Sequence, residues 1–381
     1  MKILHLGDLH LGKRVNEISM IEDQKFILDQ IVTLVKEEKI DVILLCGDIY
    51  DKAIPTIEAI HLLDEFLEEL SDLKVKVLMI SGNHDSSERL SFGRNLFKRS
   101  NLYIASQFNQ EIEKITIKED GYNINFYMLP FVKPAYINHV LKIQTETYEE
   151  CFKHLMEQVK INEDETNILL AHQFVTVGKN SPELSDSETS SLGGIDNIDY
   201  RLFDAFDYVA LGHIHKPQIV VKGMAAYAGA LEPTDKNDTG KHGFIRGEIR
   251  GGETRISFVP FAKREYLHLA LNVDKMMTAR SVMDRILEMI KERGAENLYK
   301  FTLKGFRDPE LIFEREWDEV SGNILEIVDE TVLAYDFRKI REENRSNLIG
   351  RYIESFEDCV PESIEWQALC EGVQALMESR G

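Results

Sequence analysis

Five short apolar runs lie within the first 215 residues of this 381-residue chain, and each is followed by side chains that bind metals. Runs of this length are typical of buried strands in a parallel sheet. The side chains that follow them are Asp8 and His10, Asp48, Asn83 and His84, His172, and His213 with His215. Because loops at the carboxyl ends of such strands converge, the sequence predicts one site on the rim of a layered α/β sheet.

The mixture of carboxylate, imidazole and carboxamide at this rim suits two divalent ions. Two ions about 3.5–4 Å apart can hold both the attacking and the leaving oxygen of a phosphodiester. We expect two ligand sets that share Asp48: Asp8, His10 and His215 for one ion, and Asn83, His172 and His213 for the other. Oxygen and imidazole ligands without a cysteine thiolate favour Mn²⁺, Fe or Zn²⁺, and we expect manganese.

His84 directly follows a predicted ligand, so its ring should lie beside the ions. From there it could protonate the leaving oxygen or stabilise the charge of the transition state. Asp51 and Asp85 lie one step outside the ligand set. Their carboxylates are candidates to hold histidine rings by hydrogen bonds, and solvated turn residues are the alternative interpretation.

These motifs resemble those of the calcineurin-like metallophosphoesterases. The matching segments are Gly7–His10, Gly47–Asp51, Gly82–Asp85, His172 and Gly212–His215.

Three longer strings, Asp8–Lys13, Ser81–Ser86 and Gly212–Gln218, resemble the SbcD-type nuclease subunits of bacterial SbcCD complexes. In the first two-thirds of the chain, the resemblance rests on these motifs. In the rest of the chain, it rests only on the order of the predicted helices and strands.

The resemblance implies a manganese-dependent DNA nuclease that acts as a 3′–5′ exonuclease on double strands and as an endonuclease on single strands and hairpins. Members of the family place these residues as follows: Asp8, His10, Asp48 and His215 on one ion, Asp48, Asn83, His172 and His213 on the other, and His84 as the catalytic residue. They work with an SbcC-type coiled-coil ABC ATPase, as a homodimer within a heterotetramer, in DNA end processing, repair and recombination.

Two other functions compete with this one. The first is a calcineurin-like phosphoesterase that acts on small-molecule or protein phosphates, and the added C-terminal segments argue against it. The second is a non-catalytic scaffold on the same fold. It is disfavoured because every ligand position of the family pattern is filled.

The net charge of −21 is unusual for a protein that binds DNA. Affinity for the phosphate backbone normally comes from lysine and arginine side chains that release counterions. Basic residues do occur, several of them beside the motif loops: Lys13, Arg14, Arg89, Arg94, Lys98, Arg99 and Lys216. We infer that the grip on duplex DNA is shared with another subunit. The chain has no phosphate-binding loop for ATP, so any ATP dependence must also come from a partner.

Residues 1–263 are predicted to form the nuclease domain. Apolar residues at helical spacing predict helices over Met20–Glu38 and Ile57–Leu70. The remaining predictions for this part are strands at Ile112–Ile117 and Asn123–Leu129, a helix over Ala135–Lys160 and a polar loop over Gly178–Gly194. The stretches Pro55–Leu70 and Glu88–Phe97 are candidates for a dimer interface, and ordinary core packing explains them equally well.

Residues 264–336 are predicted to form an α+β capping domain that orients DNA. Its expected elements are a helix over Ser281–Arg293, a strand around Tyr299–Leu303, a helical stretch over Leu311–Val320 and a strand at Ile324–Val328. Residues 337–381 are predicted to be a helical, partner-binding tail with two amphipathic helices, the second beginning at Pro361. Packing of these helices against the cap is the alternative to partner binding.

The cysteines and the N-terminal sequence indicate in which cellular compartment the protein is found. Cys46, Cys151, Cys359 and Cys370 show no paired spacing, so we expect no disulfide framework and a buried thiol at Cys46. The sequence has no apolar stretch long enough to span a membrane, and it begins with a predicted strand in place of a signal peptide. We therefore expect a cytoplasmic protein.

Overall fold

The computed structural model divides into two compact units, Met1–Lys263 and Arg264–Gly381. The residues described are 1–16, 18–119, 121–178, 180–184, 197–238, 240–250, 253–311, 313, 323–356, 359–360 and 363–379. Most of the predicted loop Gly178–Gly194, most of the helical stretch Leu311–Val320, and Pro361 lie outside these residues. The division between the units falls where the end of the nuclease domain is predicted, and the further division at residue 337 stays a prediction.

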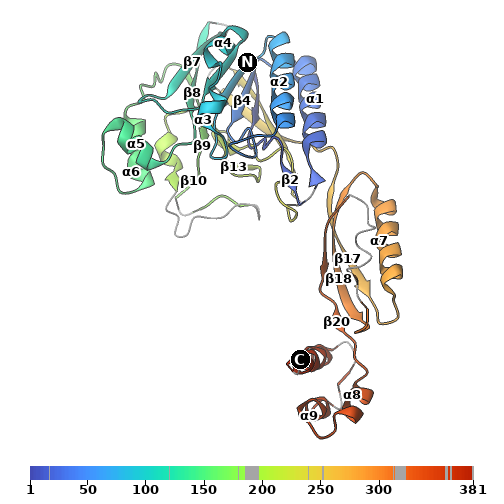
Figure 1. Cartoon of the computed structure of the whole chain (residues 1–381). Coiled ribbons are helices and arrows are strands. Elements are labelled where there is room, and N and C mark those ends of the chain that lie inside the picture. The colour runs from blue at the N-terminus through green and yellow to red at the C-terminus, as the bar shows by residue number, and fades with distance from the viewer. Residues whose placement is uncertain are drawn as a thin grey trace. The chain divides into compact units, whose positions relative to one another are not determined.

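The first unit contains two six-stranded sheets (Figure 1). The first sheet has the order β16 (Glu253–Pro260), β15 (Gly243–Arg250), β1 (Lys2–Leu6), β4 (Val42–Cys46), β5 (Lys76–Ile80) and β6 (Leu102–Ala105). The second has the order β13 (Gln218–Val221), β14 (Ala225–Tyr227), β12 (Tyr208–Gly212), β9 (Thr166–His172), β8 (Tyr122–Leu129) and β7 (Glu113–Glu119). The five apolar runs are the parallel strands β1, β4 and β5 of one sheet and β9 and β12 of the other.

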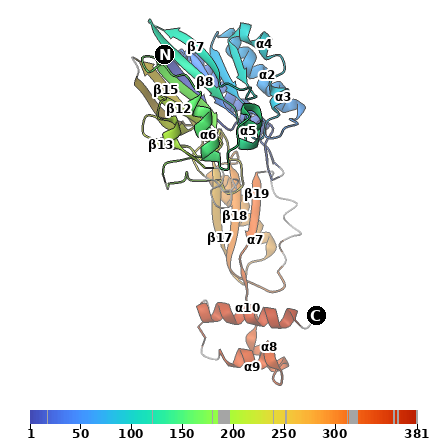
Figure 2. The ribbon, with the colours of Figure 1, turned by 90° about the vertical axis from the view of Figure 1, so that its left-hand side faces the viewer.

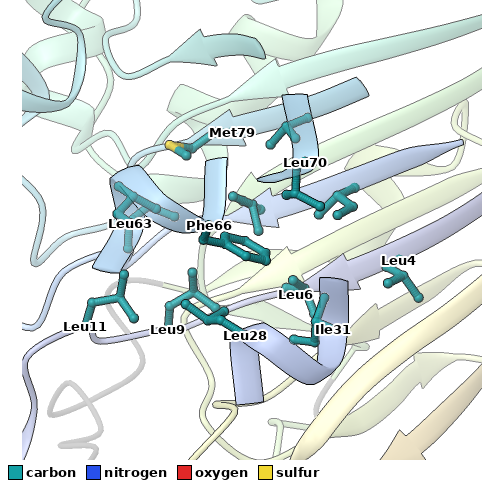
Figure 3. Packing of buried hydrophobic residues seen from close by; sticks show 14 of the residues in the cluster. Leu4, Leu6, Leu9, Leu11, Leu28, Ile31, Leu63, Phe66, Leu70 and Met79 are labelled. Carbon is teal, nitrogen blue, oxygen red and sulfur yellow. The ribbon is translucent and has the colours of Figure 1, made fainter. Parts of the chain in front are cut away.

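Successive side chains of these strands point to opposite faces of each sheet, so apolar residues are buried both between the two sheets and under the helices on their outer faces. Side chains such as Leu44 of β4 and Leu170 of β9 meet in one buried cluster formed by both sheets. Their neighbours along the strands point the other way. On the first sheet these outward side chains, with Leu4 and Leu6 of β1 among them, pack against helices α1 (Ile21–Glu38) and α2 (Ile57–Asp72), as Figure 3 shows. The predicted α/β layered fold is confirmed.

The outer face of the second sheet is covered by α5 (Pro134–Leu141) and α6 (Tyr148–Glu157). The prediction of one helix over Ala135–Lys160 is therefore wrong. The first helix ends at Lys142, whose φ of 57° is left-handed. The second begins at Thr147, whose hydroxyl oxygen accepts a hydrogen bond from the backbone N–H of Glu150 at 3.2 Å. The two caps thus separate two helices, and the residues just before the second helix, 144–147, are all polar.

The short elements of the first unit complete the connections between these strands and helices. They are β2 (Arg14–Val15), β3 (Ile18–Ser19), α3 (Ser87–Leu90), α4 (Arg94–Phe97), η1 (Lys98–Ser100), β10 (Val175–Thr176), β11 (Ile198–Asp199) and η2 (Tyr200–Phe203). The predictions of helices α1 and α2 and of strands β7 and β8 are confirmed to within a few residues at each end. The four cysteines are free, and Cys46 is fully buried in β4.

In its described residues, the second unit combines a sheet, a helix against it and a helical tail (Figure 2). Strands β17 (Tyr266–Val273), β18 (Leu298–Arg307) and β19 (Ile324–Asp329) are parallel, and β20 (Val332–Leu333) pairs with β18. Helix α7 (Ala279–Arg293) packs its apolar face on this sheet and ends at Gly294. Helices α8 (Phe337–Glu343), α9 (Leu348–Glu354) and α10 (Ile364–Glu378) share a separate small core.

Of the tail helices seen in the described residues, the sequence predicted α9 and α10 and missed α8. Among the described helices, none combines the length and apolar character that crossing a bilayer requires.

Candidate metal centre

The rim formed by the carboxyl ends of five strands carries all the predicted ligands. Asp8 and His10 follow β1, Asp48 follows β4, and Asn83 with His84 follows β5. His172 is the last residue of β9, and His213 and His215 come directly after β12. The structure therefore brings together side chains that are up to 207 positions apart in the sequence.

The first ligand group joins Asp8, His10, Asp48 and His215, all of which are buried. One ligand atom from each of these four residues lies within 4.8 Å of the others. The Nε2 atom of His10 is 3.1 Å from the Nε2 atom of His215 and 3.7 Å from Oδ2 of Asp48. Two imidazole nitrogens and two carboxylates directed at one point form a donor set suited to a divalent cation.

The second ligand group joins Asn83, His172 and His213. The amide oxygen of Asn83 is 3.0 Å from Nε2 of His172 and 2.9 Å from Nδ1 of His213. Nε2 of His172 also lies 3.4 Å from Oδ2 of Asp48. The same Asp48 oxygen faces His10 of the first group, so this carboxylate could serve ions held by both groups.

Hydrogen bonds on the far side of the rings fix how two histidines face the site. Nδ1 of His172 lies 2.7 Å from the carbonyl oxygen of Cys46, so this nitrogen donates and Nε2 points at Asp48 and Asn83. Nδ1 of His215 lies 2.9 Å from Oγ1 of Thr234. Partners of this kind orient a metal-binding imidazole and select its tautomer.

The protonation states fit a site that binds cations. Burial lowers the pKa of His213 to about 3 and that of His215 to about 4, so both rings are neutral near pH 7 and offer a lone pair. Burial also lowers the pKa of His10 well below its usual value.

Asp48 and His172 form the charged pair of the site. Burial alone would raise the pKa of Asp48, but nearby His172 and His10 outweigh it and hold that pKa below the usual range. The pKa of His172 rises to about 9 because the Asp48 charge overcomes the effect of burial. In the metal-free protein, a proton on His172 thus supplies positive charge next to Asp48.

The backbone at the ligands is strained. Asp8, His10, Asp48 and His213 have positive φ angles of 51°, 43°, 48° and 101°. Such conformations cost about 1–3 kcal/mol each and persist where the surroundings enforce them, commonly at functional sites.

Two motif glycines are required by close approach to the ligands. A Cβ atom on Gly82 would lie 2.0 Å from Oδ1 of Asp48, and one on Gly47 would lie 2.3 Å from Nδ1 of His172. Any larger residue at either position would displace a ligand.

His84 lies beside the two ligand groups, where the sequence places it. Its backbone N–H donates to Oδ1 of Asp48 at 2.8 Å, and its Nδ1 is 3.0 Å from the carbonyl oxygen of Asp51. The other ring nitrogen, Nε2, is 4.0 Å from Oδ2 of Asp48, and the side chain is 41% exposed. The ring therefore presents Nε2 at the open side of the site, where a substrate can reach it.

The two outer carboxylates differ in their contacts. Oδ1 of Asp51 lies 3.7 Å from Nδ1 of His10 and 3.0 Å from Nζ of Lys13, so it is close to a histidine ring and also forms an ion pair.

Asp85 binds backbone instead of a ring: its carboxylate accepts hydrogen bonds from the N–H groups of Ile49, Tyr50 and Gly82 at 3.1, 3.0 and 2.9 Å. Burial, and then the charge of Asp48, raises its pKa. Asp85 thus ties the loop after β4 to the loop after β5.

Sequence reasoning missed two residues that contact the site. Thr234, which faces His215, carries no sequence signal. Gln24 contacts the loop that bears His10, and a signal for it exists. It is a polar residue on the apolar face of α1, in line with Ile27, Leu28 and Ile31.

Comparison with protein families matches residues 1–217 to the calcineurin-like phosphoesterases, and the chain belongs to this family. It is a metallophosphoesterase, and the family holds a dinuclear site of divalent metal ions. The donor set described above fits such a pair of ions. Among solved structures, the chain is similar to TT1561 of Thermus thermophilus, with 13% identity, a TM-score of 0.37, and 68% of this chain and 98% of that chain covered.

Proposed function

We propose that this chain is the nuclease subunit of an SbcD-type complex and hydrolyses DNA phosphodiesters with two manganese ions. The observation that carries the hydrolytic part is the convergence of both ligand groups on Asp48, with His84 beside them. The DNA substrate is supported by the SbcD-like strings around the motifs. We expect 3′–5′ exonuclease activity on duplex ends and endonuclease activity on single strands and hairpins.

The chemistry follows from the positions of the side chains. Two bound ions would polarise the phosphate and supply a hydroxide at neutral pH. As the new bond from the attacking oxygen to phosphorus forms and the bond from phosphorus to the leaving oxygen breaks, Nε2 of His84 would give its proton to that leaving oxygen. The bond from Nδ1 of His84 to the Asp51 carbonyl keeps Nε2 directed at the site.

Access to the site suits a large substrate. Asp8, His10 and Asp48 are buried, whereas Asn83 is exposed and His84 is partly exposed. The ligands are therefore covered on one side and open on the other, and a polymer can approach the open side without entering a closed pocket.

Partners are part of the proposal because the chain is acidic. With a net charge of −21, its own surface offers little general attraction for DNA. An SbcC-type ATPase would supply the duplex grip and the ATP dependence. The helical tail is the proposed docking element, since Leu348, Val360 and Ile364 keep large apolar side chains exposed although the tail has its own core.

A second copy of the chain is the other proposed partner. Large apolar side chains are exposed on and just before α2 and on the α3–α4 segment, and they are Ile54, Ile57, Ile60, Phe92, Leu96 and Phe97. We call these six residues the apolar patch. A groove of about 710 Å³ adjoins it, lined by Ile60, Leu63, Leu67, Phe92 and Phe97 among others. Exposed apolar side chains around a groove can mark an association site, and the place of this groove beside the second and third motifs supports a homodimer.

The test is a manganese-dependent digestion of labelled duplex, hairpin and single-stranded DNA. The chain is compared with Asp48→Asn, which should lose the bridging carboxylate, and with the matched control Asp29→Asn on the exposed face of α1. DNA cleavage that requires manganese, survives in Asp29→Asn and disappears in Asp48→Asn is the expected result.

A generic substrate, bis(p-nitrophenyl) phosphate, separates the alternatives. Cleavage of this ester with no DNA cleavage, even after an SbcC-type ATPase is added, would contradict the nuclease proposal. That result would favour a phosphoesterase for small-molecule or protein phosphates.

A further inference from the structure

The loop that carries Asp8 and His10 needs support from outside, because both residues have left-handed backbone conformations. One side of this loop is held by the loop after β4. The backbone N–H groups of His10 and Leu11 donate to the carbonyl oxygens of Asp48 and Ile49 at 2.9 and 3.0 Å. These bonds keep the two ligand loops in register with each other.

On the other side, the loop contacts the buried side chain of Gln24 on α1. Its Oε1 accepts a hydrogen bond from the backbone N–H of Gly12 at 2.9 Å. Its Nε2 donates to the carbonyl oxygens of His10 at 2.8 Å and of Leu9 at 3.3 Å. Gln24 is only 4% exposed, so these three bonds form in a site from which water is largely excluded.

We propose that Gln24 is a positioning residue for the metal centre. Its carboxamide fixes the Leu9–Gly12 backbone so that the His10 ring stays directed at His215 and Asp48. Gln24 touches no reacting atom and acts only through the backbone of His10. The inference rests on the metal centre of the proposed function, and it deepens that function by explaining how the first ligand group is held in place.

The pattern of bonds makes the amide of glutamine specific at this position. A glutamate has the same shape and can still accept from Gly12, but it would present an oxygen to the carbonyl groups of Leu9 and His10. A methionine has a similar length and offers none of the three bonds. An asparagine is one methylene shorter and cannot reach both edges of the loop.

These differences define the test, which is a calorimetric titration of manganese into metal-free protein. Gln24→Met and Gln24→Glu are compared with wild type and with Gln30→Met, a matched control on the exposed face of the same helix. Outer residues that orient metal ligands typically change metal affinity by about 10–100-fold. We expect the Kd for manganese to rise by about that factor in Gln24→Met and to stay at the wild-type value in Gln30→Met.

A second measurement separates positioning from a general structural role. All ligands remain present in Gln24→Met, so excess manganese should restore the kcat for bis(p-nitrophenyl) phosphate to near the wild-type value. A side chain that only stabilised the fold would lower the Tm of the metal-free protein and leave the manganese affinity unchanged.

Equal manganese affinity in Gln24→Met and Gln30→Met would overturn the inference. Loss of folded structure in both Gln24 variants, seen by circular dichroism, would overturn it as well, because the amide would then serve the fold as a whole. The titration contains no DNA. A wild-type protein that binds manganese but cuts no DNA would therefore count against the nuclease proposal alone.

Discussion

The Nδ1 atom of His5 lies 2.8 Å from the hydroxyl oxygen of Tyr208, and this contact joins β1 of one sheet to β12 of the other. Nε2 of the same ring is 3.1 Å from the carbonyl oxygen of Leu211, two residues before His213. Nε2 therefore donates to the carbonyl and Nδ1 accepts from the tyrosine hydroxyl, which makes the ring neutral. A fully buried and fully satisfied polar pair thus connects the strands that lead into Asp8 and into His213.

Tyr208→Phe should destabilise the protein by about 1–3 kcal/mol, because it leaves Nδ1 of His5 buried without a donor. His5→Leu should do the same to the tyrosine hydroxyl. The double variant should be less destabilised than the sum of the two, with a coupling of about 0.5–3 kcal/mol. Urea unfolding of the four proteins in EDTA measures this cycle, and additive effects would mean that the contact contributes nothing.

His5 should also make stability depend on pH. Burial lowers its pKa from 6.5 to about 3, although the bond to Leu211 acts in the opposite direction. Between these two values the unfolded chain takes up a proton that the folded chain does not. The contribution of His5 to stability is therefore complete above pH 6.5 and is lost as the pH falls toward about 3.

Replacing His5 by glutamine removes the titrating group. The slope of the unfolding free energy against pH should fall in His5→Gln by up to about 1.4 kcal/mol per pH unit in the acidic range. Urea titrations in EDTA over a series of pH values measure the slope, with His154→Gln on the exposed face of α6 as the control. Equal slopes in His5→Gln and His154→Gln would show that His5 does not titrate in this way.

His84→Ala should lower kcat for DNA by about 10²–10⁴-fold, the usual range for loss of a general acid. Both ions should still bind, because His84 lies beside the ligand groups. A substrate with a good leaving group, such as the p-nitrophenyl ester of thymidine 5′-monophosphate, needs little proton transfer. The loss on this ester should therefore be much smaller.

The matched control for His84 is His61→Ala, a histidine on the exposed face of α2. Metal content measured by mass spectrometry accompanies the kinetics of both variants. Equal losses on DNA and on the p-nitrophenyl ester would remove the general-acid role and leave only stabilisation of charge.

The ligands at the rim of the sheet could be predicted from the sequence, because each is marked by residues that are neighbours in the chain. A buried parallel strand reads as a short apolar run, and a ligand directly after it must lie at the carboxyl edge of the sheet. Lys142 and Thr147 show where local patterns fail. The apolar spacing is interrupted only by the short polar run 144–147, which one continuous helix could have placed on its exposed face. The left-handed conformation of Lys142 ends the first helix, and the cap formed by Thr147 starts the second.

Contacts between distant segments were also beyond sequence reasoning. His5 and Tyr208 are separated by 203 positions, and either residue alone looks like an ordinary member of a buried strand. Gln24 interrupts an apolar helix face, which signals a buried polar contact but does not identify its partner. The partner of Gln24 depends on how α1 packs against the first sheet. The spacing of apolar residues along α1 carries no information about that packing.

The apolar patch beside α2, α3 and α4 leads to the last prediction, which concerns association. Phe92 is 84% exposed at the edge of the groove lined by Ile60 and Leu67. A charge there would have to be buried without a partner in any interface formed by this surface. Phe92→Glu should therefore convert the proposed dimer to a monomer in sedimentation velocity, while manganese binding and Tm stay near the wild-type values. Tyr122→Glu, at an exposed position on β8, is the control, and a dimer that persisted in Phe92→Glu would exclude this patch as the interface.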